Sequence, residues 1–213
     1  MSRGSDGFVL DGKGKLVDGW LDTGDLAWID HEGFVHLTGR AKDLIIRGGH
    51  NIDPAMIEDA LLAHPDVTGA AAVGRPDEHA GEVPVAYVTV VAGAPATAQE
   101  LQAWAGQHVG ERAAAPKSVT IIDAIPVTAV GKPYKPPLRA DAARIAIQDA
   151  LAKFGGVEHV EAAVDDSSIV VTITVGPSAN QYAVLAELDR YTVRWRMLSS
   201  DGGRVVGRRS GLG

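Results

Sequence analysis

The hydrophobic pattern at the start of this chain consists of short apolar stretches set among glycine and aspartate. Between residues 1 and 38 these stretches read FVL, WLDTGDLAWI and FVHLTG, with turn-forming residues between them. Short apolar runs bounded by Gly and Asp predict small strands joined by tight turns. We expect this segment to have little core of its own.

From Leu44 to Phe154 the pattern predicts a compact α+β domain of about 110 residues. A β run and a Gly-Gly turn lead into a helix that Asp53 can cap, with Pro54 suited to its first turn. Next come the apolar strands VTGAAAVG and PVAYVTVVA, an Ala-rich helix near residues 97–109 and the strand KSVTIID. A loop punctuated by proline and glycine and a final helix complete the domain, so we expect a small mixed sheet with helices.

Residues 155–213 carry a third pattern, in which strands are combined with one helix. The runs HVEAAV, SIVVTITV and YTVRWRML have strand character, whereas NQYAVLAELDR has helical spacing. The prediction is a small ββαβ extension followed by a Gly/Arg-rich end, DGGRVVGRRSGLG. No motif in it carries chemistry, so its plainest interpretation is a packing extension or one that stabilises a homo-oligomer.

Composition argues against several classes of protein. With 20 Lys and Arg against 27 Asp and Glu the formal charge is −7, which argues against a nucleic-acid binder because phosphate contacts dominate that affinity. The absence of cysteine excludes a disulfide framework and thiolate metal sites, and it fits a cytoplasmic protein. No apolar run reaches the roughly 20 residues of a membrane span, and the N-terminus lacks the apolar core of a signal peptide.

One region is basic in spite of the acidic total. Between Glu111 and Arg144 there are six lysines and arginines and three acids. Such a region suits the phosphates of a nucleotide or of CoA, and a solvated surface explains it almost as well.

Four short stretches carry the candidate chemistry. WLDTGD (residues 20–25) is a tight turn that ends in a carboxylate, and LTGRAKDLIIRGGHNIDPAMIE (37–58) holds a glycine pair that permits positive φ. The third stretch is GRPDEHAGEVPVAYV. The fourth is IPVTAVGKPYK, in which Lys132 follows Gly131 in a loop with prolines on both sides. Taken alone, a turn aspartate or a GK pair is more often local turn chemistry or a solvated lysine.

The four stretches resemble, in this order and at these intervals, the closing motifs of the adenylate-forming superfamily: TGD, GRxKDxIxxGGxNIxPxxIE, GxPDxxxGExPxA and PxTxxGKxxK. That superfamily comprises acyl- and aryl-CoA synthetases, luciferases and peptide-synthetase adenylation domains. The sequence IIRGGHNIDP is most similar to the corresponding motif of bacterial fatty acyl-CoA ligases. The resemblance implies the end of a large N-terminal adenylation domain at residues 1–41, a C-terminal lid domain at 42–154 and the extension at 155–213.

For the reaction, the resemblance implies a two-step ligation that uses ATP, Mg²⁺ and CoA. A carboxylic acid attacks the α-phosphorus of ATP to give an acyl-adenylate, and the CoA thiol then displaces AMP. Lys132 is the expected catalytic residue, because its ammonium can bridge the acid and the α-phosphate. Asp25 is expected to accept hydrogen bonds from ribose hydroxyls, and Arg40 to reach the ribose or the phosphate. A turn-capping aspartate and a surface salt bridge are the alternatives for these two residues.

The same resemblance assigns the motion between the two steps. Lys42 falls at the family's hinge, where backbone torsions change as the lid rotates. Gly48 and Gly49 would then line the channel for the pantetheine arm of CoA, since glycine lets a thin ligand pass close to the backbone. Pro133 departs from the apolar β-branched residue usual after the lysine, and a proline there stiffens the loop.

Other parts that the family needs are expected outside this sequence. The phosphate loop rich in Ser, Thr and Gly, the glutamate that helps to hold Mg²⁺ and the acid pocket all belong to the N-terminal adenylation domain. We therefore expect this chain to be inactive alone and to hold no metal itself. It would act together with that domain on ATP, CoA and a carboxylic acid. The sequences of the motifs indicate that this acid is a fatty acid.

Two other functions stay open. An adenylation domain could feed a carrier protein, although DDSS at residues 165–168 lacks the glycine pair that precedes a carrier-type serine. The chain could instead be a freestanding lid that binds a partner or a nucleotide without catalysis. The presence of Asp25, Arg40 and Lys132 argues against a decayed enzyme.

Overall fold

The computed structural model describes residues 16–17, 20–165, 168–201 and 205–209, and it divides the chain into two compact units between Leu44 and Ile45. The first unit contains β1 (Leu16–Val17), β2 (Trp20–Leu21), β3 (Asp25–Ile29), β4 (Val35–Arg40) and the 3₁₀ turn η1 (Ala41–Asp43). β1 pairs with β2 and β3 with β4, both antiparallel. Strands are thus present as predicted from residue 16 onward, while the run FVL at residues 8–10 lies outside the described residues.

Asp30 shapes the hairpin formed by β3 and β4. One of its carboxylate oxygens accepts the backbone N–H groups of Glu32 and Phe34, and the other lies 2.7 Å from His36 Nε2. The hydrogen bond to His36 lowers the pKa of Asp30. Gly33 supplies the positive φ of +88° that the turn requires.

The same hairpin leaves its apolar side chains largely uncovered. Trp28, Ile29, Phe34, Val35 and Leu37 are between 54% and 73% exposed. This agrees with the expectation of little core in this segment. Exposed apolar side chains in such number are typical of a segment that packs against another domain or molecule.

A mixed five-stranded sheet occupies the first part of the second unit, with strand order β6-β5-β8-β7 and β9 also paired to β8. Its strands are β5 (Ile45–Arg47), β6 (His50–Ile52), β7 (Val67–Asp77), β8 (Gly81–Val90) and β9 (Val119–Ile121). The accompanying helices are α1 (Pro54–Leu62), α2 (Ala98–His108), the 3₁₀ turn η2 (Arg112–Ala114) and α3 (Pro136–Leu151). β9 runs parallel to β8 and the other pairs are antiparallel, which confirms the predicted mixed sheet and the α+β class.

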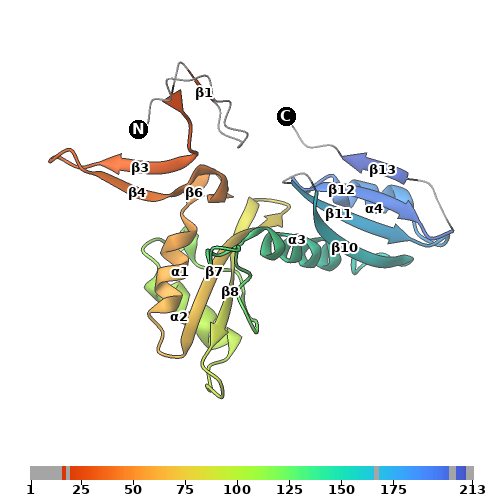
Figure 1. Ribbon diagram of the computed structural model, residues 1–213. Helices are drawn as coiled ribbons and strands as arrows, with labels where there is room; N and C mark the ends of the chain where they lie inside the picture. The colour runs from red at the N-terminus through yellow and green to blue at the C-terminus, as the bar shows by residue number, and fades with distance from the viewer. Residues whose placement is uncertain (1–15, 18–19, 166–167, 202–204, 210–213) are drawn as a thin grey trace. The chain divides into compact units, whose positions relative to one another are not determined.

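Local sequence signals start both helices that cover this sheet. The Asp53 carboxylate accepts the Ala55 N–H where Pro54 begins α1, and Thr97 with Glu100 forms a reciprocal capping box at α2. α1 lies against β7 and β8, and α2 lies beside α1 and against β9 (Figure 1). The core that they share with the strands includes Ile45, Ile52, Ile57, Leu61, Val88, Leu101 and Ala105.

A second sheet forms the last part of the unit, with strand order β10-β11-β12-β13. Its elements are β10 (Val157–Asp165), β11 (Ser168–Val175), α4 (Gln181–Leu188), β12 (Arg194–Ser199) and β13 (Val205–Arg209). The ββαβ order predicted for the extension is confirmed through β12. The Gly/Arg-rich end, for which no element is predicted, contains β13, because the edge of β12 supplies its backbone partners. Residues 202–204 and 210–213 of that end lie outside the described residues.

Helix α3 packs on both sheets of the second unit. Leu138 and Ala142 belong to a core with β7 and β8, whereas Ile147 and Leu151 belong to the core of the second sheet. One helix therefore contributes to two cores, and the predicted lid and extension segments lie in a single compact unit that begins at Ile45.

Candidate functional site

Asp25 and Arg40 face each other across the β3–β4 hairpin. The strand register pairs the two residues directly, and Arg40 Nε lies 3.1 Å from Asp25 Oδ1. Gly24, at φ +69°, leads the chain into Asp25. The salt bridge considered as the alternative for Arg40 is thus present, and it also holds a guanidinium beside a partly exposed carboxylate. Together these groups suit the hydroxyls of a ribose and a neighbouring phosphate.

Lys42 lies in η1, the 3₁₀ turn that ends the first unit. Arg40 before the turn has φ −115° and ψ +135°, and Leu44 after it has φ −56° and ψ +139°, so the chain is non-helical on both sides. The boundary between the two units follows directly after Leu44. The connection is short, and a change in a few of its torsions would turn one unit against the other.

Gly48 and Gly49 form the tip of the β5–β6 hairpin, with φ of +56° and +88°. A side chain at either position would meet no atom within 4 Å, so the backbone torsion, and not crowding, calls for glycine here. The Gly48 N–H donates to Ala80 O at 2.8 Å, which fixes this loop against the turn between β7 and β8.

Lys132 follows the tip of a small loop that precedes α3. The Thr128 N–H donates to Lys132 O at 2.8 Å, the Lys132 N–H donates to Thr128 Oγ1 at 3.2 Å, and Gly131 has φ +77°. Val127 and Pro133 pair as an isolated bridge on either side of this tip. Lys132 is exposed, and no acidic side chain in the described ranges forms an ion pair with it. The loop backbone is ordered by its own hydrogen bonds.

Lys135, at the base of the same loop, has a structural role that sequence reasoning missed. Its ammonium lies 2.7 Å from Glu58 Oε1, and its side chain is 16% exposed. Glu58 Oε1 also accepts the Ala72 N–H at 2.8 Å, so this ion pair ties the loop to α1 and β7. Because Lys135 and Glu58 are far apart in sequence, no local signal marks the pair.

Some of the lysines and arginines between Glu111 and Arg144 already form ion pairs, so this region has fewer cations available for a phosphate than its charge implies. Lys135 is paired with Glu58, and Arg144 lies 2.7 Å from Asp141 one turn earlier in α3. Lys132 remains exposed.

The expected site residues fall into two groups, one on each compact unit. Asp25 and Arg40 are brought together in the first unit, close in sequence to Lys42. Lys132 and the pair Gly48 and Gly49 lie on separate loops of the second unit. Within the described ranges, no group of three or more His, Cys, Asp or Glu side chains is placed to hold a metal ion, and no helix is long and apolar enough to cross a membrane.

Residues 56–132 match the family model of the AMP-binding enzyme C-terminal domain. The marinolic acid–CoA ligase of a Pseudoalteromonas species is 54% identical to this chain, over 58% of the chain and 19% of the ligase. A medium/long-chain-fatty-acid–CoA ligase of Mycobacterium tuberculosis is 42% identical, over 58% of the chain and 23% of the ligase. The chain therefore spans about a fifth of the length of these relatives.

A solved structure shows a similar fold. The crystal structure of ATP-bound MatB from Rhodopseudomonas palustris superposes with a TM-score of 0.57 at 35% sequence identity. The similarity covers 61% of this chain and 25% of MatB.

Proposed function

We propose, from the chain's membership of the AMP-binding enzyme C-terminal domain family over residues 56–132, that it is the C-terminal part of an ATP-dependent ligase that joins a carboxylic acid to CoA. In the first step a carboxylate oxygen attacks the α-phosphorus of ATP, giving acyl-adenylate and pyrophosphate. In the second step the CoA sulfur attacks the acyl carbon and AMP leaves. Magnesium would accompany the ATP phosphates, and we assign its ligands to the larger adenylation domain.

The observation that carries this proposal is the exposed Lys132 on its hydrogen-bonded loop tip. A lysine ammonium is a compact cation, and on a fixed loop it can reach between two anions as they approach each other. The attack of carboxylate on phosphate brings two negative groups together, so a positioned cation lowers the barrier. Asp25 and Arg40 would hold the ribose of the same nucleotide, and Lys42 would act as the hinge between the steps.

The apolar surface of the β3–β4 hairpin supports a large N-terminal domain as partner. Trp28, Phe34 and Leu37 are each more than half exposed, and burying the exposed part would stabilise an interface by about 1–2 kcal/mol per side chain. In this proposal the hairpin belongs to the adenylation domain, and the unit after Leu44 is the mobile lid.

A fatty acid is the substrate class that we propose. The sequence of the IIRGGHNIDP motif supports it, and so does the similarity to the Mycobacterium tuberculosis relative, a medium/long-chain-fatty-acid–CoA ligase. The absence of cysteine supports a cytoplasmic location.

A hybrid enzyme tests the proposal with this chain's own residues. Residues 20–213 would replace the matching C-terminal part of the Mycobacterium tuberculosis fatty-acid–CoA ligase, whose large domain supplies the acid pocket. The hybrid is expected to form acyl-CoA from a medium-chain fatty acid. A second hybrid, carrying the corresponding part of the marinolic acid–CoA ligase, controls for compatibility between the parts. Activity in the control together with none in the hybrid would refute the proposed function.

Asp25→Ala in the hybrid is expected to weaken AMP binding about tenfold, because a carboxylate that accepts hydrogen bonds from ribose hydroxyls is lost. Isothermal titration calorimetry measures the change. Glu32→Ala, at the far end of the same hairpin, removes the same charge and is expected to leave the affinity unchanged. Equal affinities for AMP in all three proteins would remove Asp25 from the nucleotide site.

The chain by itself is expected to bind ATP only weakly, with a Kd of about a millimolar or higher. Among the described residues, Asp25, Arg40 and Lys132 are the contacts that we propose for ATP, and a solvated lysine without a fixed phosphate beside it offers a screened surface charge. An ATP–pyrophosphate exchange assay with a panel of fatty and aromatic acids is expected to show no exchange. Robust exchange with any acid would show that the chain is catalytically complete.

A further inference from the structure

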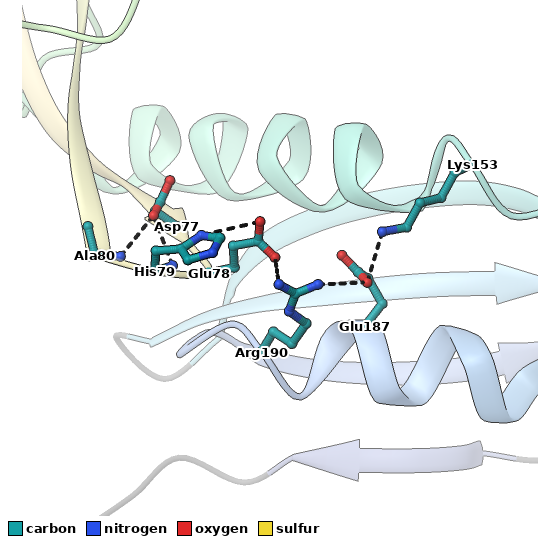
Figure 2. Close-up of polar contacts among 7 residues, drawn as sticks. All are labelled: Asp77, Glu78, His79, Ala80, Lys153, Glu187 and Arg190. Carbon is teal, nitrogen blue, oxygen red and sulfur yellow. Dashed lines mark hydrogen bonds and ion pairs between the residues drawn. The ribbon is translucent and has the colours of Figure 1, made fainter.

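The turn between β7 and β8 is held in shape by its own aspartate. Asp77 Oδ1 accepts the N–H groups of His79 at 3.0 Å and Ala80 at 2.9 Å, and Gly81 closes the turn at φ +77°. Figure 2 shows the Glu78 carboxylate between two basic side chains: one oxygen lies 3.3 Å from His79 Nδ1 and the other forms an ion pair with Arg190, just after α4. The turn is therefore one compact piece of backbone with a carboxylate on its outer side.

The inner side of this turn holds the Gly48–Gly49 loop. Besides the bond from Gly48 N–H to Ala80 O, Arg47 pairs with Gly81 in the antiparallel register of β5 and β8. The Ile46 N–H donates to the Glu82 carboxylate at 3.0 Å. Gly48 and Arg47 thus have their partners in the turn and at its end, and Ile46 has its partner at the start of β8, so a displaced turn would displace the loop.

The outer side of the turn is attached to the extension. Arg190, just after α4, forms an ion pair with Glu78 and lies 3.5 Å from Glu187 Oε2, which also receives Lys153 Nζ at 3.0 Å (Figure 2). Glu187 is 8% exposed. Burial, followed by the charges of Glu78 and Glu187, raises the pKa of the neighbouring Tyr191. Arg190 is therefore the cation that sits between a carboxylate of the turn and a buried carboxylate of the extension.

We infer that Arg190 is a positioning residue for the CoA step: by holding Glu78 it fixes the β7–β8 turn, and through the turn it fixes the Gly48–Gly49 loop that would line the pantetheine channel. The inference rests on the proposed function and assigns a role to the extension, which carries no catalytic motif of its own. The contacts run from Arg190 to Glu78 by an ion pair, along the backbone of the turn to Ala80, and from Ala80 O to the Gly48 N–H by a hydrogen bond.

The size of the effect follows from the exposure of the pair. Arg190 and Glu78 side chains are 46% and 27% exposed, so their ion pair is partly screened by water. Partly exposed pairs contribute about 1 kcal/mol, which corresponds to about a fivefold change in an equilibrium. Loss of Arg190 would therefore loosen the turn and the loop without unfolding the unit, whose cores it leaves intact.

Hydrogen exchange on the full 213-residue chain tests the mechanical link without any activity. Arg190→Gln is expected to speed the exchange of the Gly48, His79 and Ala80 amides about fivefold, because these bonds break when the turn opens. Lys153→Gln is the matched control, since it removes the same charge from the same network but does not contact the turn. Its expected effect on these amides is less than about twofold.

Kinetics of the hybrid enzyme test the consequence for CoA. Arg190→Gln is expected to raise the KM for CoA about fivefold with little change in kcat, and to leave pyrophosphate release in the first step unchanged. Glu78→Gln should give the same pattern, and the effect of the double variant should be smaller than the sum of the two single effects, because both substitutions remove the ion pair between Arg190 and Glu78. Arg190→Lys should restore part of the affinity for CoA.

The two experiments separate failure of the inference from failure of the proposed function. If the unsubstituted hybrid forms no acyl-CoA, the proposed function fails and the exchange data still decide the link between Arg190 and the loop. If the hybrid is active, unchanged amide exchange or an unchanged KM for CoA in Arg190→Gln would overturn the inference. An equal loss of rate in both half-reactions of Arg190→Gln would also overturn it, since that result would indicate general destabilisation of the protein.

Discussion

Replacing Lys132 by alanine in the hybrid is expected to slow acyl-adenylate formation about a thousandfold. The reason is that, in the proposed mechanism, the first step brings a carboxylate and a phosphate together, and the exposed Lys132 would be the cation between them. The second step, started from acyl-adenylate made beforehand, should keep its rate, because in the proposed mechanism the thiol would attack after the lid has turned and carried Lys132 away. Quenched-flow measurements of pyrophosphate and acyl-CoA separate the two rates.

Lys117→Ala is the control for this substitution. Lys117 is also an exposed lysine of the second unit, and it lies just before β9, outside the motif. Its removal is expected to change neither half-reaction by more than about twofold. If Lys132→Ala slows both half-reactions equally, or if Lys117→Ala matches its effect, Lys132 is not the bridging cation.

Replacing Lys42 by proline is expected to have the opposite signature, with near-normal pyrophosphate release and acyl-CoA formation slowed about a hundredfold. Proline fixes its own φ and pushes the preceding residue out of the helical region. In η1 this would block the torsional change by which the lid rotates between the steps. If the torsions favoured by proline keep Lys132 inserted, the first step proceeds and the second does not.

Lys42→Ala separates the backbone from the side chain. Alanine retains the torsional freedom of lysine, so both half-reactions should stay within about twofold of the unsubstituted hybrid. A hinge that acts through its side chain would fail this control. Normal rates for both steps in Lys42→Pro would show that the lid turns at some other residue.

Most helices and strands of the fold can be predicted from the sequence, because local sequence patterns such as capping residues indicate where they begin. Asp53 with Pro54, and Thr97 with Glu100, start α1 and α2 where the capping patterns predict. β13 is the exception: its short run is interrupted by glycine, and it becomes a strand because β12 offers a free edge. That edge exists only once the sheet has assembled.

The contacts of the candidate site are harder to predict from the sequence, because they join residues that are distant in sequence. The motifs identify Asp25 and Arg40 as separate candidate residues. Their pairing follows from the register of the hairpin, which contains an irregularity between Leu26 and Ala27. The pair of Lys135 with Glu58 and that of Arg190 with Glu78 have no local pattern at all. They follow from how α3 and α4 pack, which periodicity alone does not fix.

The transfer of oxygen from the acid to AMP is the most direct measurement of the central claim, that this chain completes a ligase working through an acyl-adenylate. The hybrid would be given a fatty acid labelled with ¹⁸O in its carboxylate, together with ATP and CoA, and the products examined by mass spectrometry. Attack on the α-phosphorus places one labelled oxygen in AMP and leaves the other in the acyl-CoA carbonyl, and this is the result that we expect. Unlabelled AMP, or label recovered in inorganic phosphate, would contradict the account.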